Sequence, residues 1–137
     1  MKRVFADTFF WVAMALVTDQ WHLPAIVARK KLGGVQIVTT DYVLVEFLTS
    51  LSGSGASIRQ QAALSVEDML ADERLAVLPE SRETFLEGLS LFKNRLDKGH
   101  SMTDCISMNV CKSLGISEVL TNDRHFEQEG FTVLISR

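Results

Sequence analysis

The sequence predicts an α/β fold, a three-layer α/β/α sandwich around a mostly parallel sheet of four to five strands. Short apolar runs of strand length alternate along the chain with segments of helix length. Because a helix between two strands returns the second strand in the same direction, this alternation favours parallel pairing with helices on both faces. The composition agrees, since 47% of the 137 residues are hydrophobic and only 2 are proline. We expect a single domain over residues 1–137.

The first half of the chain is expected to begin with a buried strand, Arg3 to Ala6, followed by a helix over the apolar run from Thr8 to Val17. Gly33-Gly34 ends the next helix, as glycine commonly does. Asp41 stands where a helix cap is expected, and the clearest loop is Ser52-Gly53-Ser54-Gly55. The other elements predicted here are a helix over 24–32, a strand over 36–39, a helix over 42–51 and a helix over about 58–71.

The second half continues the alternation of strands and helices. Leu75 to Leu78 has the length and composition of a strand, and Ser81 can cap a helix that runs to about Leu96. Ser101 and Asp104 match the serine and the third-position acid of a capping box, so they open another helix. That helix ends at residue 115, a glycine, and it is followed by a strand over 118–121, a turn or short helix over 123–128 and a closing strand over 132–135.

Four carboxylates lie in or just beyond otherwise apolar segments: Asp7, Glu46, Asp104 and Asp123. A carboxylate that loses hydration in such surroundings costs several kcal/mol unless a cation compensates it. If Asp7 and Asp123 follow neighbouring strands, they meet at the carboxyl edge, where α/β sheets bind ligands. The pattern therefore predicts a hard, oxygen-rich site suited to Mg²⁺ or Mn²⁺.

Each acid taken alone has a structural alternative. Asp7 could cap the helix that begins near residue 8, and Asp104 could belong only to its capping box. Asp123 could be an ordinary turn residue. Capping does not explain Glu46, which falls in the second turn of a helix, so its alternative is a surface position beside the apolar stripe. A shared site is favoured because the alternatives require four separate coincidences.

Charge, membrane and cysteine patterns narrow the function classes. The net charge of −3 gives no overall attraction to nucleic acid, which counts against a nonspecific nucleic-acid binder but not against an enzyme that uses metal ions and a local basic patch. No apolar stretch is long enough to cross a membrane, and a cytoplasmic protein is expected. Cys105 and Cys111 lie too far apart on one helix for a disulfide and are expected to be buried thiols.

Basic side chains beside the third and fourth acids are candidate contacts for a phosphate backbone, although any one of them taken alone is more often a solvated surface charge. No histidine has zinc-site spacing with another histidine or with a cysteine, so the sequence does not predict zinc. These candidate contacts are Lys98, His100 and Arg124, with His125 beside them.

Four short motifs stand in a distinctive order along the chain. They are Ala6-Asp7-Thr8, then Glu46 inside a helix, then Met102-Thr103-Asp104, then Thr121-Asn122-Asp123 followed by His125-Phe126. This order resembles the PIN domain family, and within it the VapC-like ribonuclease toxins of type II toxin–antitoxin pairs.

The resemblance implies a nuclease that cleaves RNA with Mg²⁺ or Mn²⁺. Asp7, Glu46, Asp104 and Asp123 would hold the metal, while Thr8 and Thr121 would support these acids through their hydroxyl groups. The resemblance also implies a homodimer and a small cognate antitoxin protein that blocks the site.

Two other functions are compatible with the sequence. A regulatory or scaffold domain could keep a PIN-like fold while its acids serve only as caps or surface charges. A phosphate-transferring α/β domain would use Asp7 as a phospho-accepting nucleophile, although no partner lysine is clearly placed for that role.

Overall fold

Five strands form one fully parallel sheet in the computed structural model, which describes residues 1–137. The first strand of the chain is central, with the second strand on one side and the fourth on the other. The predicted α/β fold with a parallel sheet of four to five strands is thereby confirmed. The order across the sheet is β3 (Leu75–Leu78), β2 (Gln36–Thr40), β1 (Arg3–Ala6), β4 (Glu118–Leu120) and β5 (Thr132–Val133).

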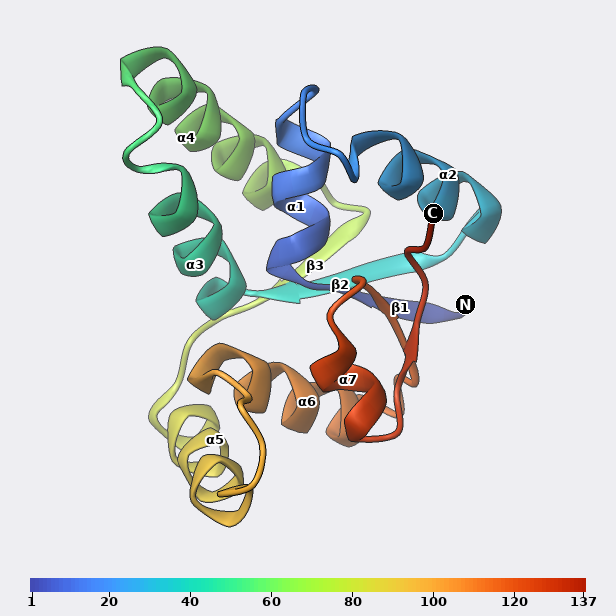
Figure 1. Ribbon diagram of the computed structural model, residues 1–137, viewed down its shortest axis with the longest axis vertical. Coiled ribbons are helices and arrows are strands. Elements are labelled where there is room, and N and C mark those ends of the chain that lie inside the picture. The colour runs from blue at the N-terminus through green and yellow to red at the C-terminus, as the bar shows by residue number, and fades with distance from the viewer.

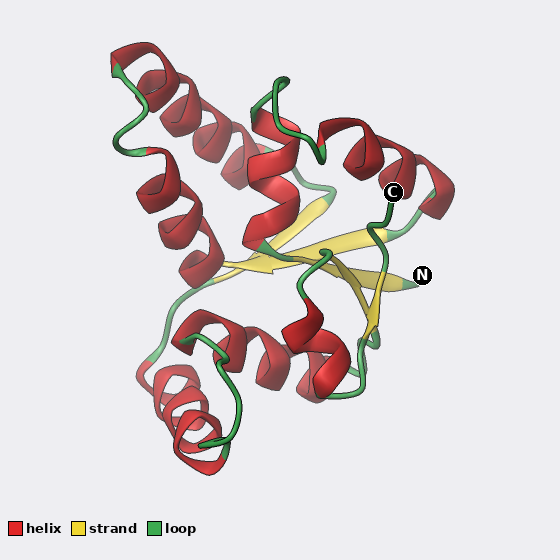
Figure 2. Ribbon diagram, in the orientation of Figure 1, coloured by secondary structure: helices red, strands yellow, loops and turns green.

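Helices cover both faces of this sheet (Figure 1). One layer contains α1 (Thr8–Ala15), α2 (His22–Leu32), α3 (Asp41–Leu51) and α4 (Ala56–Ala71). The other layer contains α5 (Arg82–Asn94), α6 (Met102–Leu114) and α7 (Arg124–Gln128). Figure 2 shows the strands between these two helical layers, which is the predicted α/β/α arrangement. No helix combines the length and the apolar character needed to cross a membrane.

The central strand β1 is buried on both faces because its side chains alternate between two hydrophobic clusters. Phe5 packs with Met108 of α6 in one cluster, whereas Val4 and Ala6 pack with Phe10 of α1 in the other. The carboxyl end of β1 is therefore held firmly from both sides.

The sheet order reverses between β1 and β4, because β2 and β3 lie on one side of β1 while β4 and β5 lie on the other. The two strands pair in register, with Phe5 opposite Val119 and Ala6 opposite Leu120. In open α/β sheets ligands bind beyond the carboxyl ends of strands at such a reversal. The residues that follow Ala6 and Leu120 are therefore the first place to look for a site.

The N-cap of α3 differs from the prediction. The hydroxyl of Thr40 accepts a hydrogen bond from the backbone N–H of Val43 at 3.2 Å, so Thr40 is the cap. Asp41, which the sequence indicated as the cap, is the first helical residue, and its carboxylate accepts from the N–H of Glu80 at 3.1 Å. Both residue types suit a cap, and the extended backbone of Thr40 decides between them.

Several predicted boundaries shift by one or two residues. The helix that contains Pro24 begins at His22, which places the proline in the first turn, where its missing N–H costs no hydrogen bond. Other ends lie earlier than predicted: α1 ends at Ala15, α5 at Asn94, β4 at Leu120 and β5 at Val133. The predicted helix over 58–71 begins earlier, at Ala56, and β2 extends one residue further, to Thr40.

Gly88 allows α5 and α6 to approach closely. A Cβ atom at this position would lie 2.5 Å from Cγ1 of Ile106 and 3.3 Å from Cε of Met102. We expect Gly88→Ala to lower the free energy of unfolding by about 1–2 kcal/mol, because overpacking outweighs the better helix propensity of alanine. Urea unfolding measures this change. Gly53→Ala, in an open loop, is the control and should have little effect; an unchanged or raised stability of Gly88→Ala would contradict the close packing.

Candidate metal centre

Asp7 follows β1 and lies beside the end of β4. Its backbone N–H donates to the carbonyl of Leu120 at 3.4 Å, and its Oδ2 accepts from the hydroxyl of Thr121 at 3.0 Å. The residue is only 4% exposed, and Oδ1 has no hydrogen-bond partner. Although Asp7 precedes the first residue of α1, its carboxylate makes no capping hydrogen bond. Helix capping therefore does not explain this buried acid.

Burial raises the pKa of the Asp7 carboxyl to about 7, with the negative charge of Asp104 acting in the same direction. The hydrogen bond from Thr121 opposes this shift but does not cancel it. A buried carboxylate with an unpartnered oxygen is stabilised in its ionised form when a cation lies beside it. Asp7 therefore has the properties expected of a side chain that binds a metal cation.

Asp104 lies at the start of α6 and takes part in the predicted capping box. Its Oδ2 accepts from the N–H of Ser101 at 3.1 Å, while the hydroxyl of Ser101 accepts from the N–H of Asp104 at 3.0 Å. The residue is 6% exposed. Burial raises the pKa of its carboxyl, and the negative charges of Asp123 and Glu46 raise it further. The capping box therefore holds in place an acid whose carboxylate lies near two other negative charges.

Asp123 follows β4 and caps the short helix α7. Its Oδ1 accepts from the N–H of His125 at 2.9 Å, and its own N–H donates to the hydroxyl of Thr121 at 3.0 Å. The Thr121 hydroxyl therefore contacts both Asp7 and Asp123. Thr121 thus contacts two of the four predicted acids.

Glu46 projects from α3 and is half-buried. Its negative charge contributes to the raised pKa of both Asp7 and Asp104, so the fold brings its carboxylate near these two acids. All four predicted acids thus gather beyond the strand ends where the sheet order reverses.

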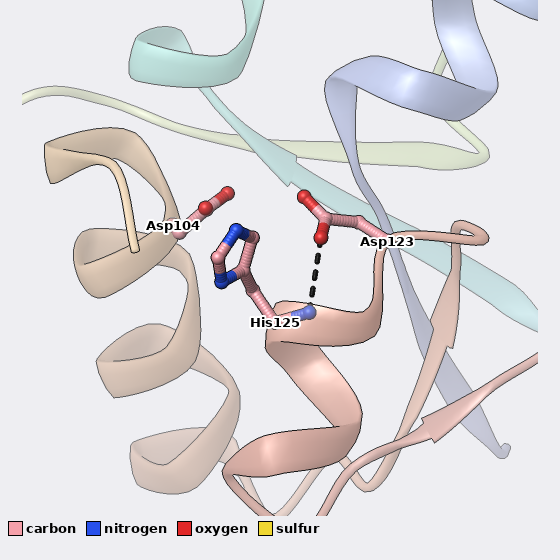
Figure 3. A group of neighbouring side chains, drawn as sticks. All are labelled: Asp104, Asp123 and His125. Carbon is pink, nitrogen blue, oxygen red and sulfur yellow. Dashed lines mark hydrogen bonds between the residues drawn. The ribbon is translucent and has the colours of Figure 1, made fainter. Parts of the chain in front are cut away.

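The tightest group of donor atoms consists of Asp104, Asp123 and His125, whose ligand atoms all lie within 4.8 Å of one another. Figure 3 shows the two carboxylates facing each other, with one ring nitrogen of His125 directed toward them. Asp7 and Glu46 are not members of this group. The three-residue group, the unpartnered oxygen of Asp7 and the raised carboxyl pKa values together fit a divalent cation.

The remaining predicted residues divide between the surface and the interior. Lys98 and Arg124 are exposed, and Lys98 lies near Asp97, with Nζ 3.5 Å from its carboxylate. His100 is only 5% exposed and bonds to other side chains, which corrects the suggestion that its ring is presented to RNA. The hydroxyl of Thr8 is buried and makes no hydrogen bond, so it does not contact the acids in the way Thr121 does.

His125 belongs to the donor group, but the search for zinc-site spacing among histidines and cysteines did not identify it. Its signal in the sequence is the spacing Asp123-x-His125 at the start of a helix, with the ring two residues beyond a strand-end acid. Its neighbour in space, Asp104, comes from another helix and could not be inferred from local spacing.

The sequence matches the family model described as the PIN domain over residues 4–131. Among curated proteins, none gives a significant match. The fold is similar to the crystal structure of VapC20 from Mycobacterium tuberculosis, described as a toxin that cleaves the sarcin–ricin loop. The two superpose with a TM-score of 0.87 over 97% of this chain and 99% of that chain, at 21% sequence identity.

Proposed function

Because the chain belongs to the PIN domain family, we propose that it is a metal-dependent endoribonuclease and the toxin of a toxin–antitoxin pair. Residues 1–137 form its single nuclease domain. One observation carries the proposal. Four carboxylates gather at the reversal of the sheet, and none of them forms an ion pair with a lysine or arginine. Uncompensated acids of this kind are costly unless they bind a cation that serves the function.

Asp104 and Asp123 would hold the ion, with Asp7 and Glu46 completing its negatively charged surroundings. A divalent ion bound there supplies an acidified water and neutralises charge on a phosphoryl group. Thr121 orients Asp7 and Asp123 through its two hydrogen bonds, and the capping box orients Asp104. The exposed side chains of Lys98 and Arg124 would contact the phosphate backbone and so position RNA without reading its sequence.

The proposal extends to the ion, the partners and the compartment. The ion is Mg²⁺ or Mn²⁺, because both accept carboxylate oxygens. A homodimer and a cognate antitoxin protein are its partners, and the cytoplasm is its compartment. Apolar side chains exposed on α5 support a protein contact, since a grouped apolar surface favours association. They are Phe85, Leu86, Leu89 and Phe92.

Expression of the protein in a bacterial host, with and without its antitoxin, tests this function. We expect growth arrest and new RNA ends at defined positions only when the antitoxin is absent. The sarcin–ricin loop of ribosomal RNA is the first position to map, because a protein of similar fold is described as cleaving it. Normal growth and intact RNA with the protein expressed alone would favour a scaffold role instead.

Glu46→Gln is expected to reduce RNA cleavage by about 100-fold or more while the protein stays folded. The substitution keeps the shape of the side chain but removes one negative charge beside Asp7 and Asp104, which weakens the hold on a divalent ion. Cleavage rates and circular dichroism measure the two effects. Glu67→Gln, on the exposed face of α4, is the matched control. An unfolded Glu46→Gln variant would show that Glu46 has a structural role.

A further inference from the structure

A chain of hydrogen bonds leads from the acid cluster to a partly exposed arginine. Arg95 donates to Glu129 through Nε at 2.6 Å and through Nη2 at 3.3 Å. Glu129 in turn pairs with Nε2 of His100 at 3.1 Å, and Nδ1 of His100 pairs with Nδ1 of His125 at 2.9 Å. The side chains of Glu129 and His100 are 7% and 1% exposed. This chain is therefore an internal feature that links helix α5 to the site.

When both histidines are neutral, the hydrogen bonds determine which nitrogens carry protons. The hydrogen bond from Arg95 lowers the pKa of Glu129, so Glu129 is ionised and can only accept. Nε2 of His100 must then donate, which leaves Nδ1 of a neutral His100 as an acceptor. Nδ1 of His125 must therefore donate to it. In a neutral His125 the remaining nitrogen, Nε2, then has a free lone pair.

That lone pair faces other acceptors. The donor atoms of His125, Asp104 and Asp123 lie within 4.8 Å of one another, and Figure 3 shows the free ring nitrogen directed toward the two carboxylates. A lone pair opposite two carboxylates is repulsive unless a proton or a metal ion lies between them, so these three donors form a set that a divalent ion can occupy. The unpartnered Oδ1 of Asp7, in a residue that is 4% exposed, is a second and independent observation that favours a cation beside these acids.

We propose that His125 is a nitrogen ligand of the divalent ion, and that His100, Glu129 and Arg95 are positioning residues that fix its ring and tautomer. A ligating histidine commonly donates its second N–H to an acceptor that fixes its tautomer, and here Nδ1 of His100 is that acceptor. The inference rests on the metal site of the proposed function, and it adds a preference for one divalent ion over another. Imidazole suits transition metals, whereas Mg²⁺ favours oxygen, so Mn²⁺ should bind more tightly than Mg²⁺.

Pulsed electron paramagnetic resonance of the Mn²⁺-loaded protein tests the proposal directly. We expect the wild type to show coupling of Mn²⁺ to a directly bound ¹⁴N nucleus. His125→Gln should lose this coupling and bind Mn²⁺ about 10-fold more weakly or worse by calorimetry, with a smaller change for Mg²⁺. His22→Gln is the control, because the ring of His22 bonds to the carbonyl of Ala13 on another part of the fold.

The positioning role has its own test. Glu129→Gln keeps the size of the side chain but removes the anionic acceptor, so the tautomer of His100 is no longer fixed. We expect Mn²⁺ affinity to fall about 10- to 100-fold, with a ¹⁴N coupling that is weaker than in the wild type but present. An unchanged affinity and coupling in this variant would overturn the positioning role.

The outcomes separate this inference from the proposed function. Mn²⁺ bound without ¹⁴N coupling in the wild type would overturn the nitrogen ligand and leave the metal-dependent nuclease intact. A protein that binds no Mn²⁺ at millimolar concentration would overturn both. Coupling that persists in His125→Gln would assign the nitrogen to another residue and overturn the role of His125.

Discussion

Asp104→Asn is expected to abolish RNA cleavage while the protein remains folded. Asparagine keeps an oxygen that can accept from the N–H of Ser101, so the capping box at the start of α6 survives. The asparagine side chain, however, has no negative charge with which to bind a divalent ion. Lewis-acid stabilisation is worth several kcal/mol, which corresponds to a loss in cleavage rate of about 1,000-fold. Single-turnover cleavage of RNA measures the effect.

Ser101→Ala is the matched control for this variant. It removes the hydroxyl that accepts from the N–H of Asp104 but leaves the carboxylate in place. The expected loss is about 1 kcal/mol of stability, with cleavage retained. If Asp104→Asn instead loses stability and still cleaves RNA, capping is the whole role of Asp104.

Asp7→Asn is expected to stabilise the metal-free protein at pH 8, although it replaces a buried residue at the site. The pKa of the Asp7 carboxyl is about 7 in the folded protein and 3.8 in its ordinary state. Between these values the unfolded chain releases a proton that the folded protein retains, so stability falls as the pH rises from 4 to 7. Asparagine removes this penalty, which is on the order of 2–4 kcal/mol above pH 7.

Urea unfolding in a chelator at pH 5 and at pH 8 measures the pH dependence. The advantage of Asp7→Asn should be large at pH 8 and much smaller at pH 5. Addition of Mn²⁺ should stabilise the wild type more than the variant, because the ion favours the ionised carboxylate. Asp97→Asn, on the surface, should show neither effect. An Asp7→Asn variant that is less stable at pH 8 would contradict the account of Asp7 as an uncompensated acid.

The sequence was sufficient to predict the parallel sheet because its strands, such as Arg3 to Ala6, are apolar runs separated by segments of helix length. It also indicated which acids would gather, because acids that follow parallel strands share one edge of the sheet. It could not show that β1 and β4 are neighbours, because other strand orders have the same pattern along the chain. The pairing of Ala6 with Leu120 in the structure shows that these two strands are neighbours.

Sequence patterns could not predict the chain of hydrogen bonds that passes through His100 and His125. His100, His125 and Glu129 come from a loop, the start of α7 and the residue after it, and they meet only through the packing of α6 against α7. Sequence reasoning made His100 a candidate RNA contact because it flanks Asp104 along the chain. In the structure its ring is buried and makes hydrogen bonds to residues 25 and 29 positions away, which local spacing cannot reveal.

RNA cleavage by the purified protein before and after removal of divalent metal tests the central claim most directly. We expect cleavage to stop in the presence of a chelator and to return when Mg²⁺ or Mn²⁺ is added in excess, with Asp104→Asn inactive throughout. Cleavage that persists in the chelator, or that Asp104→Asn retains, would contradict the assignment of these acids to a catalytic metal site.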